Sequence, residues 1–187
     1  QDIPVVELVV NDGTSISNEL IYGEIHGLKK DEDGSALAGA TFGLFTTDGT
    51  EPILTAFSAA DGSFSFTGVP YGEYVVREIA APEGYVTDDT PYAVKIDADG
   101  AVVEIEAVNT CIHGSVQLTK ADRDYPDHHL TGAEFEVYRD GELVGTLEEL
   151  PDGVNRLDGL AYGDYTLKET KAPAGFSLDE QTYAFSI

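Results

Sequence analysis

The sequence predicts an all-β protein that consists of two tandem β-sandwiches of about seven strands each. Apolar and polar residues alternate over many short stretches, and none of them shows the period of about 3.6 residues that marks a helix. Turn signals separate these stretches roughly every eight to twelve residues. The chain also repeats itself, and a repeat of this length indicates two domains rather than one.

The repeat is clearest in a segment that carries a glutamate, a proline and a glycine. Residues 71–85 read YGEYVVREIAAPEGY, and residues 162–176 read YGDYTLKETKAPAGF. The offset is 91 residues, as from Glu78 to Glu169. A second pair of segments matches at the same offset: NELIYGEIHGLKKD begins at Asn18, and NTCIHGSVQLTKAD begins at Asn109.

The first 18 residues have the pattern of a hairpin. A β-branched run covers residues 3–10, the turn Asn-Asp-Gly follows it, and Thr14, Ile16 and Asn18 then alternate with other residues. The match between Asn18 and Asn109 indicates that residues 1–22 are the last hairpin of a preceding repeat or an N-terminal strand extension.

Residues 23–110 are expected to form the first complete sandwich. Its strands are expected near residues 25–29, 40–44, 53–57, 64–66, 74–78, 92–96 and 103–109. Residues 111–187 repeat this order from Gly114 to Ile187, with turns such as Asp152-Gly153 at the matching places. The second sandwich lacks a counterpart of the strand that ends at Asn109, so we expect the chain to be a piece of a longer protein.

Composition excludes several classes of function. The chain has 187 residues, of which 35 are acidic and 10 are basic, and its net charge is −25. Such a field repels nucleic acid and anionic membrane surfaces, so neither is an expected partner. No signal peptide and no transmembrane run is evident, and the single cysteine, Cys111, has no ligand spacing around it. We expect no cofactor and no metal.

Three polar residues of the first repeat fall on stripes that are expected to face the core. Lys29 follows Ile25 and Gly27 on one face, Glu78 follows Tyr74 and Val76, and Asn109 ends the last strand. Burying such groups without partners is costly. They could form a hydrogen-bonded structural cluster, the faces could be wrongly assigned at strand ends, or the three side chains could react with one another.

A reaction among these residues is chemically reasonable. Burial favours the uncharged forms of both an amine and a carboxyl group. A neutral lysine amine is a nucleophile, and a protonated carboxyl can donate to an amide and carry protons while ammonia leaves. The product would be an amide bond between Lys29 and Asn109. Lys30 competes for the nucleophile role, although the alternation and the Lys-x-Asp match favour Lys29.

These motifs carry a resemblance to a known family. The signature YxLxExxAPxGY, preceded by a GSVxLxKxD strand and a GAxF strand, resembles the Cna protein B-type domain of the SpaA-like group, found in pilins and adhesins on the surface of Gram-positive bacteria. The resemblance covers residues 23–187 and, more weakly, residues 1–22. It implies an immunoglobulin-like fold and an extracellular location at the cell surface or cell wall.

The resemblance also implies a self-formed isopeptide bond. In repeat one, the lysine and asparagine that join are Lys29 and Asn109, and Glu78 is the proton shuttle. In repeat two, Lys120 and Glu169 occupy the same positions, and no asparagine of that repeat completes them. Asn18 is an asparagine whose partner would lie outside its own domain. Gly27 departs from the family pattern, because a bulky residue is usual there.

The expected function is a structural stalk or shaft module of a pilin or a cell-wall-anchored adhesin, and not an enzyme. Its partners are then neighbouring domains or pilus subunits, and strand donation between chains is an alternative way to complete repeat two. A module that binds host extracellular matrix through its sandwich loops, such as residues 125–129, is the alternative function. The acidic turns near Asp31 and Asp97 are better explained as turns than as calcium loops.

Overall fold

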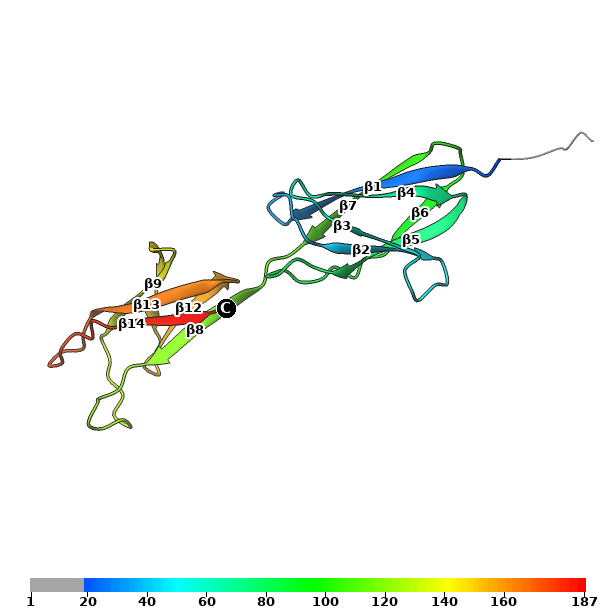
Figure 1. The fold of residues 1–187 in the computed structure, drawn as a ribbon. Helices are drawn as coiled ribbons and strands as arrows, with labels where there is room; N and C mark the ends of the chain where they lie inside the picture. The colour runs from blue at the N-terminus through cyan, green and yellow to red at the C-terminus, as the bar shows by residue number, and fades with distance from the viewer. Residues whose placement is uncertain (1–18) are drawn as a thin grey trace, which may run out of the picture.

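The computed structural model describes residues 19–187, so Asn18 and the predicted hairpin of residues 1–18 lie outside the described residues. Within that range the secondary structure consists of strands, which confirms the all-β prediction. Two sandwiches lie end to end along the chain (Figure 1). No helix in the described range is long and apolar enough to span a membrane.

The first sandwich has two sheets and seven strands, as predicted. One sheet has the order β4-β1-β7, and the other has the order β3-β2-β5-β6. The strands are β1 (Tyr22–Asp31), β2 (Thr41–Thr46), β3 (Leu54–Phe57), β4 (Ser63–Pro70), β5 (Gly72–Ala80), β6 (Tyr92–Ile96) and β7 (Val102–Asn109).

Strand β7 returns to lie beside the first strand of the domain. It pairs with β1 in parallel, and the register places Lys29 opposite Ala107 and Asp31 opposite Asn109. Paired residues on neighbouring strands point to the same face, so the side chains of Lys29 and Asn109 are diagonal neighbours on the core side. The first and last strands of the sandwich are therefore held edge to edge.

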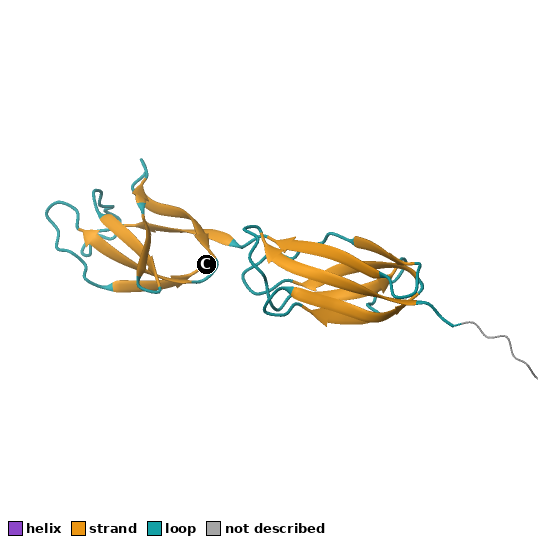
Figure 2. Cartoon of the chain, turned by 90° about the horizontal axis from the view of Figure 1, so that it is seen from above, coloured by secondary structure: helices purple, strands orange, loops and turns teal. Residues whose placement is uncertain are grey.

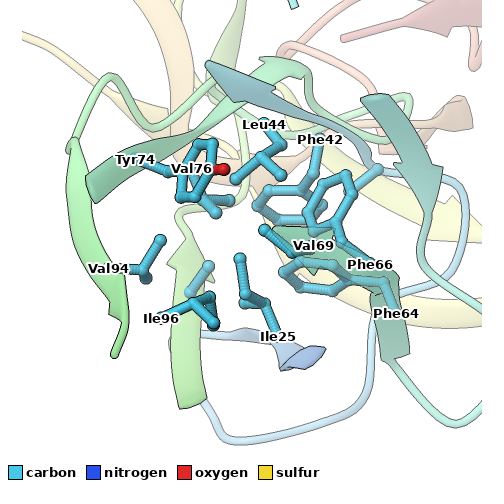
Figure 3. Close-up of a cluster of buried hydrophobic side chains, with 12 residues drawn as sticks. Ile25, Phe42, Leu44, Phe64, Phe66, Val69, Tyr74, Val76, Val94 and Ile96 are labelled. Carbon is cyan, nitrogen blue, oxygen red and sulfur yellow. The ribbon is translucent and has the colours of Figure 1, made fainter. Parts of the chain in front are cut away.

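A cluster of aliphatic and aromatic side chains from both sheets forms the core of the first sandwich (Figure 3). The rings of Phe42 and Phe64 stack with centroids 3.8 Å apart. A Cβ at Gly27 would overlap the Phe64 ring, so glycine is required there because an aromatic ring covers it. This contact explains the departure from the family pattern at Gly27.

The second sandwich repeats this arrangement with two differences among the described residues: it has no counterpart of β7, and it has an additional short strand, β11, beside β12. Its sheets have the orders β11-β12-β8 and β10-β9-β13-β14. The strands are β8 (His113–Thr119), β9 (Glu134–Arg139), β10 (Glu142–Thr146), β11 (Glu148–Glu149), β12 (Val154–Ala161), β13 (Asp164–Lys171) and β14 (Thr182–Ser186). Within residues 19–187, strand β8 pairs with β12 on one side only, whereas its counterpart β1 pairs on both sides.

The Pro-Gly loop of the first sandwich contacts the start of the second sandwich. Figure 2 shows loops of the first sandwich at the place where the two sandwiches meet. The amide of Ile112 donates to the carbonyl of Gly84 at 2.8 Å, and the amide of Tyr162 donates to the carbonyl of Ile112 at 2.8 Å. The Tyr162 ring covers Gly84, where a Cβ would lie 2.7 Å from the ring. The Tyr162 hydroxyl also donates to Glu83 at 2.6 Å. Both backbone and side chains thus fix the joint between the sandwiches.

Candidate crosslink site

Strand alternation directs Lys29 into the core of the first sandwich. Its side chain is fully buried, at 0% exposure, between the two sheets. The neighbouring Lys30 points to the other face, where its Nζ donates to Glu106 at 2.6 Å. Strand geometry therefore turns Lys29, and not Lys30, toward Glu78.

Glu78 lies on the opposite sheet and reaches both other members of the cluster. Its Oε1 is 3.1 Å from the Lys29 Nζ, a close ionic contact that lacks hydrogen-bond alignment. Its Oε2 accepts a hydrogen bond from the Asn109 Nδ2 at 2.9 Å. One carboxyl group therefore bridges the amine and the carboxamide, and each of its oxygens faces a different nitrogen.

Asn109 is held by its side-chain nitrogen. Besides Glu78, the Nδ2 donates to the carbonyl oxygen of Val86 at 2.6 Å. The Oδ1 is buried and has no hydrogen-bond partner within the described residues. Fixing the nitrogen on two acceptors sets the orientation of the amide group.

The loop after the Pro-Gly turn completes the surroundings of Glu78. The backbone amide of Asp88 donates to Glu78 Oε2 at 2.7 Å. Desolvation opposes ionisation of the Asp88 carboxyl, but hydrogen bonds from Thr90 and Tyr92 and the charge of Lys29 outweigh it and lower its pKa. Burial, together with Asp88, raises the pKa of Tyr92 to about 12, so this phenol remains a donor.

Sequence reasoning missed the contributions of Val86 and Asp88. Both act through backbone atoms, which the residue type does not reveal. A signal was nevertheless present, because Asp88 recurs as Asp179 at the same offset of 91 residues. The amide of Asp179 donates to Glu169 Oε2 at 2.7 Å, the distance found in the first sandwich.

The second sandwich holds the matching pair without the amide. The Lys120 Nζ lies 2.9 Å from Glu169 Oε1. The Lys120 side chain is 21% exposed, whereas the Glu169 side chain is 1% exposed. The pair lies in an open, mostly apolar groove of about 340 Å³. The groove is lined by Val116, Leu118, Lys120, Phe135, Leu167, Glu169, Asp179, Tyr183 and Phe185.

A further buried amide, Asn155, was missed by sequence reasoning. It lies in β12 opposite Leu118, where the first sandwich has Phe64 opposite Gly27. The large and small residues of the pair have thus exchanged strands. Asn155 is 1% exposed, and neither side-chain polar atom has a hydrogen-bond partner in the described part of the chain.

The other polar clusters do not form a comparable site. Asp31 accepts hydrogen bonds from the amides of Asp33 and Ser35, as a turn residue does. Among residues 19–187, no group of three or more histidine, cysteine or acidic side chains is arranged to hold a metal ion. Cys111 is a half-buried free thiol at the joint.

Comparison with known proteins agrees with this architecture. The family model for the SpaA prealbumin-like fold domain matches residues 23–111 and 114–187. A collagen adhesin of Staphylococcus aureus is 27% identical over 86% of this chain, which spans 16% of that protein. The chain therefore covers only a small part of this curated relative.

Solved structures of other proteins also have this fold. The TIE protein of Bacillus anthracis superposes with a TM-score of 0.80 and 31% identity over 89% of this chain and 31% of the other. The pilus adhesin SpaC of Lactobacillus rhamnosus shares the fold, with a TM-score of 0.54 and 18% identity over 88% of this chain and 26% of the other. With both sandwiches matched, the chain belongs to the SpaA family of prealbumin-like fold domains.

Proposed function

We propose that this chain is a structural module of a surface-anchored pilin or adhesin, and that a self-formed Lys29–Asn109 isopeptide bond stabilises its first sandwich. The observation that carries the proposal is the bridging carboxyl of Glu78, which contacts the amine through one oxygen and the carboxamide through the other. Membership of the SpaA family, with a collagen adhesin among the similar proteins, supports a structural role at the cell surface. The domain division at residues 22/23 and 110/111 belongs to the same proposal.

The reaction follows from the positions of the three side chains. Glu78 first takes a proton from the Lys29 ammonium, and the resulting amine attacks the Cγ of Asn109, so that the Nζ–Cγ bond forms and negative charge develops on the Oδ1. Glu78 accepts a proton from Nζ and delivers a proton to Nδ2, which leaves as ammonia. Atoms balance, no cofactor is needed, and the reaction occurs once per molecule rather than in turnover.

The bond would change how the module responds to force. It closes a loop of 80 residues (109 minus 29). Closing such a loop stabilises by about 4–5 kcal/mol if the chain-entropy account for disulfides applies to an amide. Because β1 and β7 begin and end the sandwich, tension entering at one end would pass through the bond to the other end and leave the strands between them unloaded.

Intact mass spectrometry tests the proposal. The chain is expected to weigh about 17 Da less than its sequence mass, for the one ammonia lost. Glu78→Gln keeps the shape of the side chain and removes the proton shuttle, so this variant should keep its full mass. Lys30→Ala is the matched control and should still show the loss. Full mass in the folded wild-type chain would contradict the bond.

The match to a collagen adhesin favours a second candidate function, direct binding of host matrix by this module. Surface plasmon resonance against immobilised collagen separates the two candidates. A pure spacer gives no saturable signal, whereas a binding module gives one that is lost when the exposed loop of residues 125–129 is replaced by glycine and serine.

A further inference from the structure

We propose that docking of the second sandwich positions Asn109 for the crosslinking reaction of the first, so that the isopeptide bond forms fastest when the joint between the sandwiches is closed. The inference rests on the proposed Lys29–Asn109 reaction and concerns how that reaction is controlled. A continuous series of contacts leads from Tyr162, in the second sandwich, to the side chain of Asn109. Tyr162 is thereby a positioning residue for chemistry that takes place in the first sandwich.

The series ends at the carboxamide of Asn109. Its Nδ2 carries two hydrogens and donates to two acceptors, to Glu78 Oε2 at 2.9 Å and to the carbonyl oxygen of Val86 at 2.6 Å. A backbone carbonyl only accepts hydrogen bonds, so Val86 holds the nitrogen of the amide, and not its oxygen, on this side. The nitrogen that leaves as ammonia is therefore kept beside the proton shuttle.

The Val86 carbonyl matters most after Glu78 has taken the lysine proton. An ionised Glu78 only accepts hydrogen bonds, and by itself it selects the nitrogen of Asn109. A protonated Glu78 is also a donor, and the amide oxygen then becomes an equally good partner for it. The contact with Val86 opposes that rotation, because the rotated amide would place its oxygen against the oxygen of the Val86 carbonyl.

The position of the Val86 carbonyl depends on its backbone. The Val86 side chain is 56% exposed, so packing in the core does not hold it. Its amide donates to the carbonyl of Thr110 at 2.9 Å, and the amide of Ile112 donates to the carbonyl of Gly84 at 2.8 Å. The Pro-Gly loop and the linker that follows β7 thus form a short antiparallel ribbon, residues 84–86 with residues 110–112.

Tyr162 of the second sandwich contacts both sides of this ribbon. Its amide donates to the carbonyl of Ile112 at 2.8 Å, on the linker side. Its ring covers Gly84 on the loop side, where a Cβ would lie 2.7 Å from the ring, and its hydroxyl donates to Glu83 at 2.6 Å. Docking of the second sandwich therefore holds the ribbon together, and the ribbon holds the Val86 carbonyl against Asn109.

The first sandwich holds the same region through two contacts of its own. Glu32, which directly follows β1, accepts the amide of Cys111 on both carboxyl oxygens at 3.0 Å. The amide of Asp88 donates to Glu78 at 2.7 Å. Neither contact involves the second sandwich, so both remain when the joint opens. Opening the joint should therefore slow the reaction rather than abolish it.

The size of the effect follows from the kind of reaction. The amine, the carboxyl and the amide belong to one folded domain, so the rate depends on how often the amide lies in the geometry for attack. A roughly tenfold change in rate corresponds to about 1.4 kcal/mol in the barrier. That is about the net contribution of one hydrogen bond. Loss of the Tyr162 contacts should therefore slow bond formation roughly tenfold.

This coupling would give maturation of the chain a definite order. The second sandwich folds and docks, the ribbon becomes fixed, and the bond then closes the first sandwich. Chains whose joint is correctly closed would thus be crosslinked first.

Timed mass spectrometry on the whole chain tests the inference. The chain is made by cell-free translation, samples are quenched in acidic denaturant, and the loss of about 17 Da is followed with time. Tyr162→Ala should slow this loss roughly tenfold. Tyr162→Phe keeps the ring on Gly84 and should restore most of the rate. Tyr71→Ala is the matched control, because Tyr71 is the counterpart of Tyr162 at an offset of 91 residues, and it should react at the wild-type rate.

A second measurement reports on the Asn109 amide directly. Lys29→Met removes the amine and keeps a side chain of similar length, so the amide persists and can be observed by NMR. The Nδ2 hydrogens should exchange slowly with solvent in this variant and faster when Tyr162→Ala is added. The backbone amides of β1 and β7 should keep their protection in both. Loss of protection throughout the first sandwich would overturn the inference, because Tyr162 would then act through folding.

The two measurements separate this inference from the proposed function. A wild-type chain that folds and never loses ammonia refutes the proposed function itself. Loss of ammonia at the same rate in wild type and in Tyr162→Ala refutes the coupling alone. Slower loss in Tyr162→Ala, with rescue by Tyr162→Phe and faster exchange confined to Asn109, is the result expected.

Discussion

At the scale of single residues, buried polar groups in this protein divide into those with partners and those without. Lys29, Glu78 and Asn109 are buried together and contact one another through one carboxyl. Asn155 is buried alone in the second sandwich and has no hydrogen-bond partner among the described residues. A buried amide without partners costs about 1–3 kcal/mol. The first group therefore has a chemical explanation, and Asn155 is a local destabilisation.

Replacing Asn155 with leucine should therefore stabilise the second sandwich by about 1–2 kcal/mol, because the side chain keeps its approximate size and loses its unpaired polar atoms. Differential scanning calorimetry measures this as a higher midpoint for the transition of the second sandwich. The transition of the first sandwich is the internal control and should not move. A lower midpoint would show that the amide has a partner in solution.

Replacing Gly27 with alanine should lower the stability of its sandwich, because the added Cβ would overlap the Phe64 ring. We expect a loss of about 1–3 kcal/mol in the stability of the first sandwich. Alanine at Gly34, where a Cβ meets nothing but φ is +87°, tests backbone strain without overlap. Chemical denaturation of both variants, measured with Glu78→Gln also present to remove the proposed bond, separates these effects.

At the scale of elements, the loop after the Pro-Gly turn holds the glutamate of each sandwich from outside the strands. In both copies a backbone amide of an aspartate donates to the glutamate Oε2, from Asp88 to Glu78 and from Asp179 to Glu169. The carboxylate of each aspartate in turn accepts bonds from the residues that follow it. The conformation of the loop thus depends on an ionised aspartate.

This arrangement gives a pH dependence with a definite sign. The folded-state pKa of Asp88 is lowered from 3.8, so its stabilising contribution is present above that value and is lost as pH falls through the lower folded-state pKa. Asp88→Asn should therefore be less stable than wild type at about pH 6, and the difference should shrink below about pH 4. Thermal melts across this acidic range measure it. A difference that is constant with pH would contradict the assignment.

At the scale of the whole molecule, the two sandwiches are joined by a built interface rather than a loose linker. The backbone bonds around Ile112, the ring of Tyr162 on Gly84 and the bond from Tyr162 to Glu83 act at one place. The hydrogen bond to Glu83 also raises the pKa of the Tyr162 hydroxyl, so the donor remains protonated at neutral pH. The joint therefore favours an extended arrangement, which a spacer requires.

Tyr162→Ala should loosen this joint without unfolding either sandwich. Small-angle X-ray scattering should show a broader distribution of interatomic distances, and the two thermal transitions should remain. Tyr71→Ala is the matched control, because the same residue type at the equivalent position is exposed at the far end of the first sandwich. Identical scattering from wild type and Tyr162→Ala would mean that the backbone bonds alone fix the joint.

The local sequence pattern was sufficient to predict much of the fold and most of the site residues of this protein. Alternation with a period of two placed Lys29, Glu78 and Asn109 on core-facing stripes, because a strand directs successive side chains to opposite faces whatever it pairs with. The offset of 91 residues revealed the two sandwiches and the lysine–glutamate pair of the second, because repeated residues imply repeated structure. Those inferences needed no knowledge of which strands are neighbours.

Only the tertiary structure decided how these residues meet. The parallel register of β1 and β7 made Lys29 and Asn109 neighbours, and the facing sheet turned one oxygen of Glu78 toward each of them. The tertiary structure also decided three other features. These are the backbone contacts to Glu78 and Asn109, the lack of a hydrogen-bond partner for Asn155 among the described residues, and the position of the Tyr162 ring at the joint. The physical reason is that the two-residue alternation of a strand determines which face of the sheet a side chain is on. Contacts between distant segments depend instead on strand order and on packing between sheets.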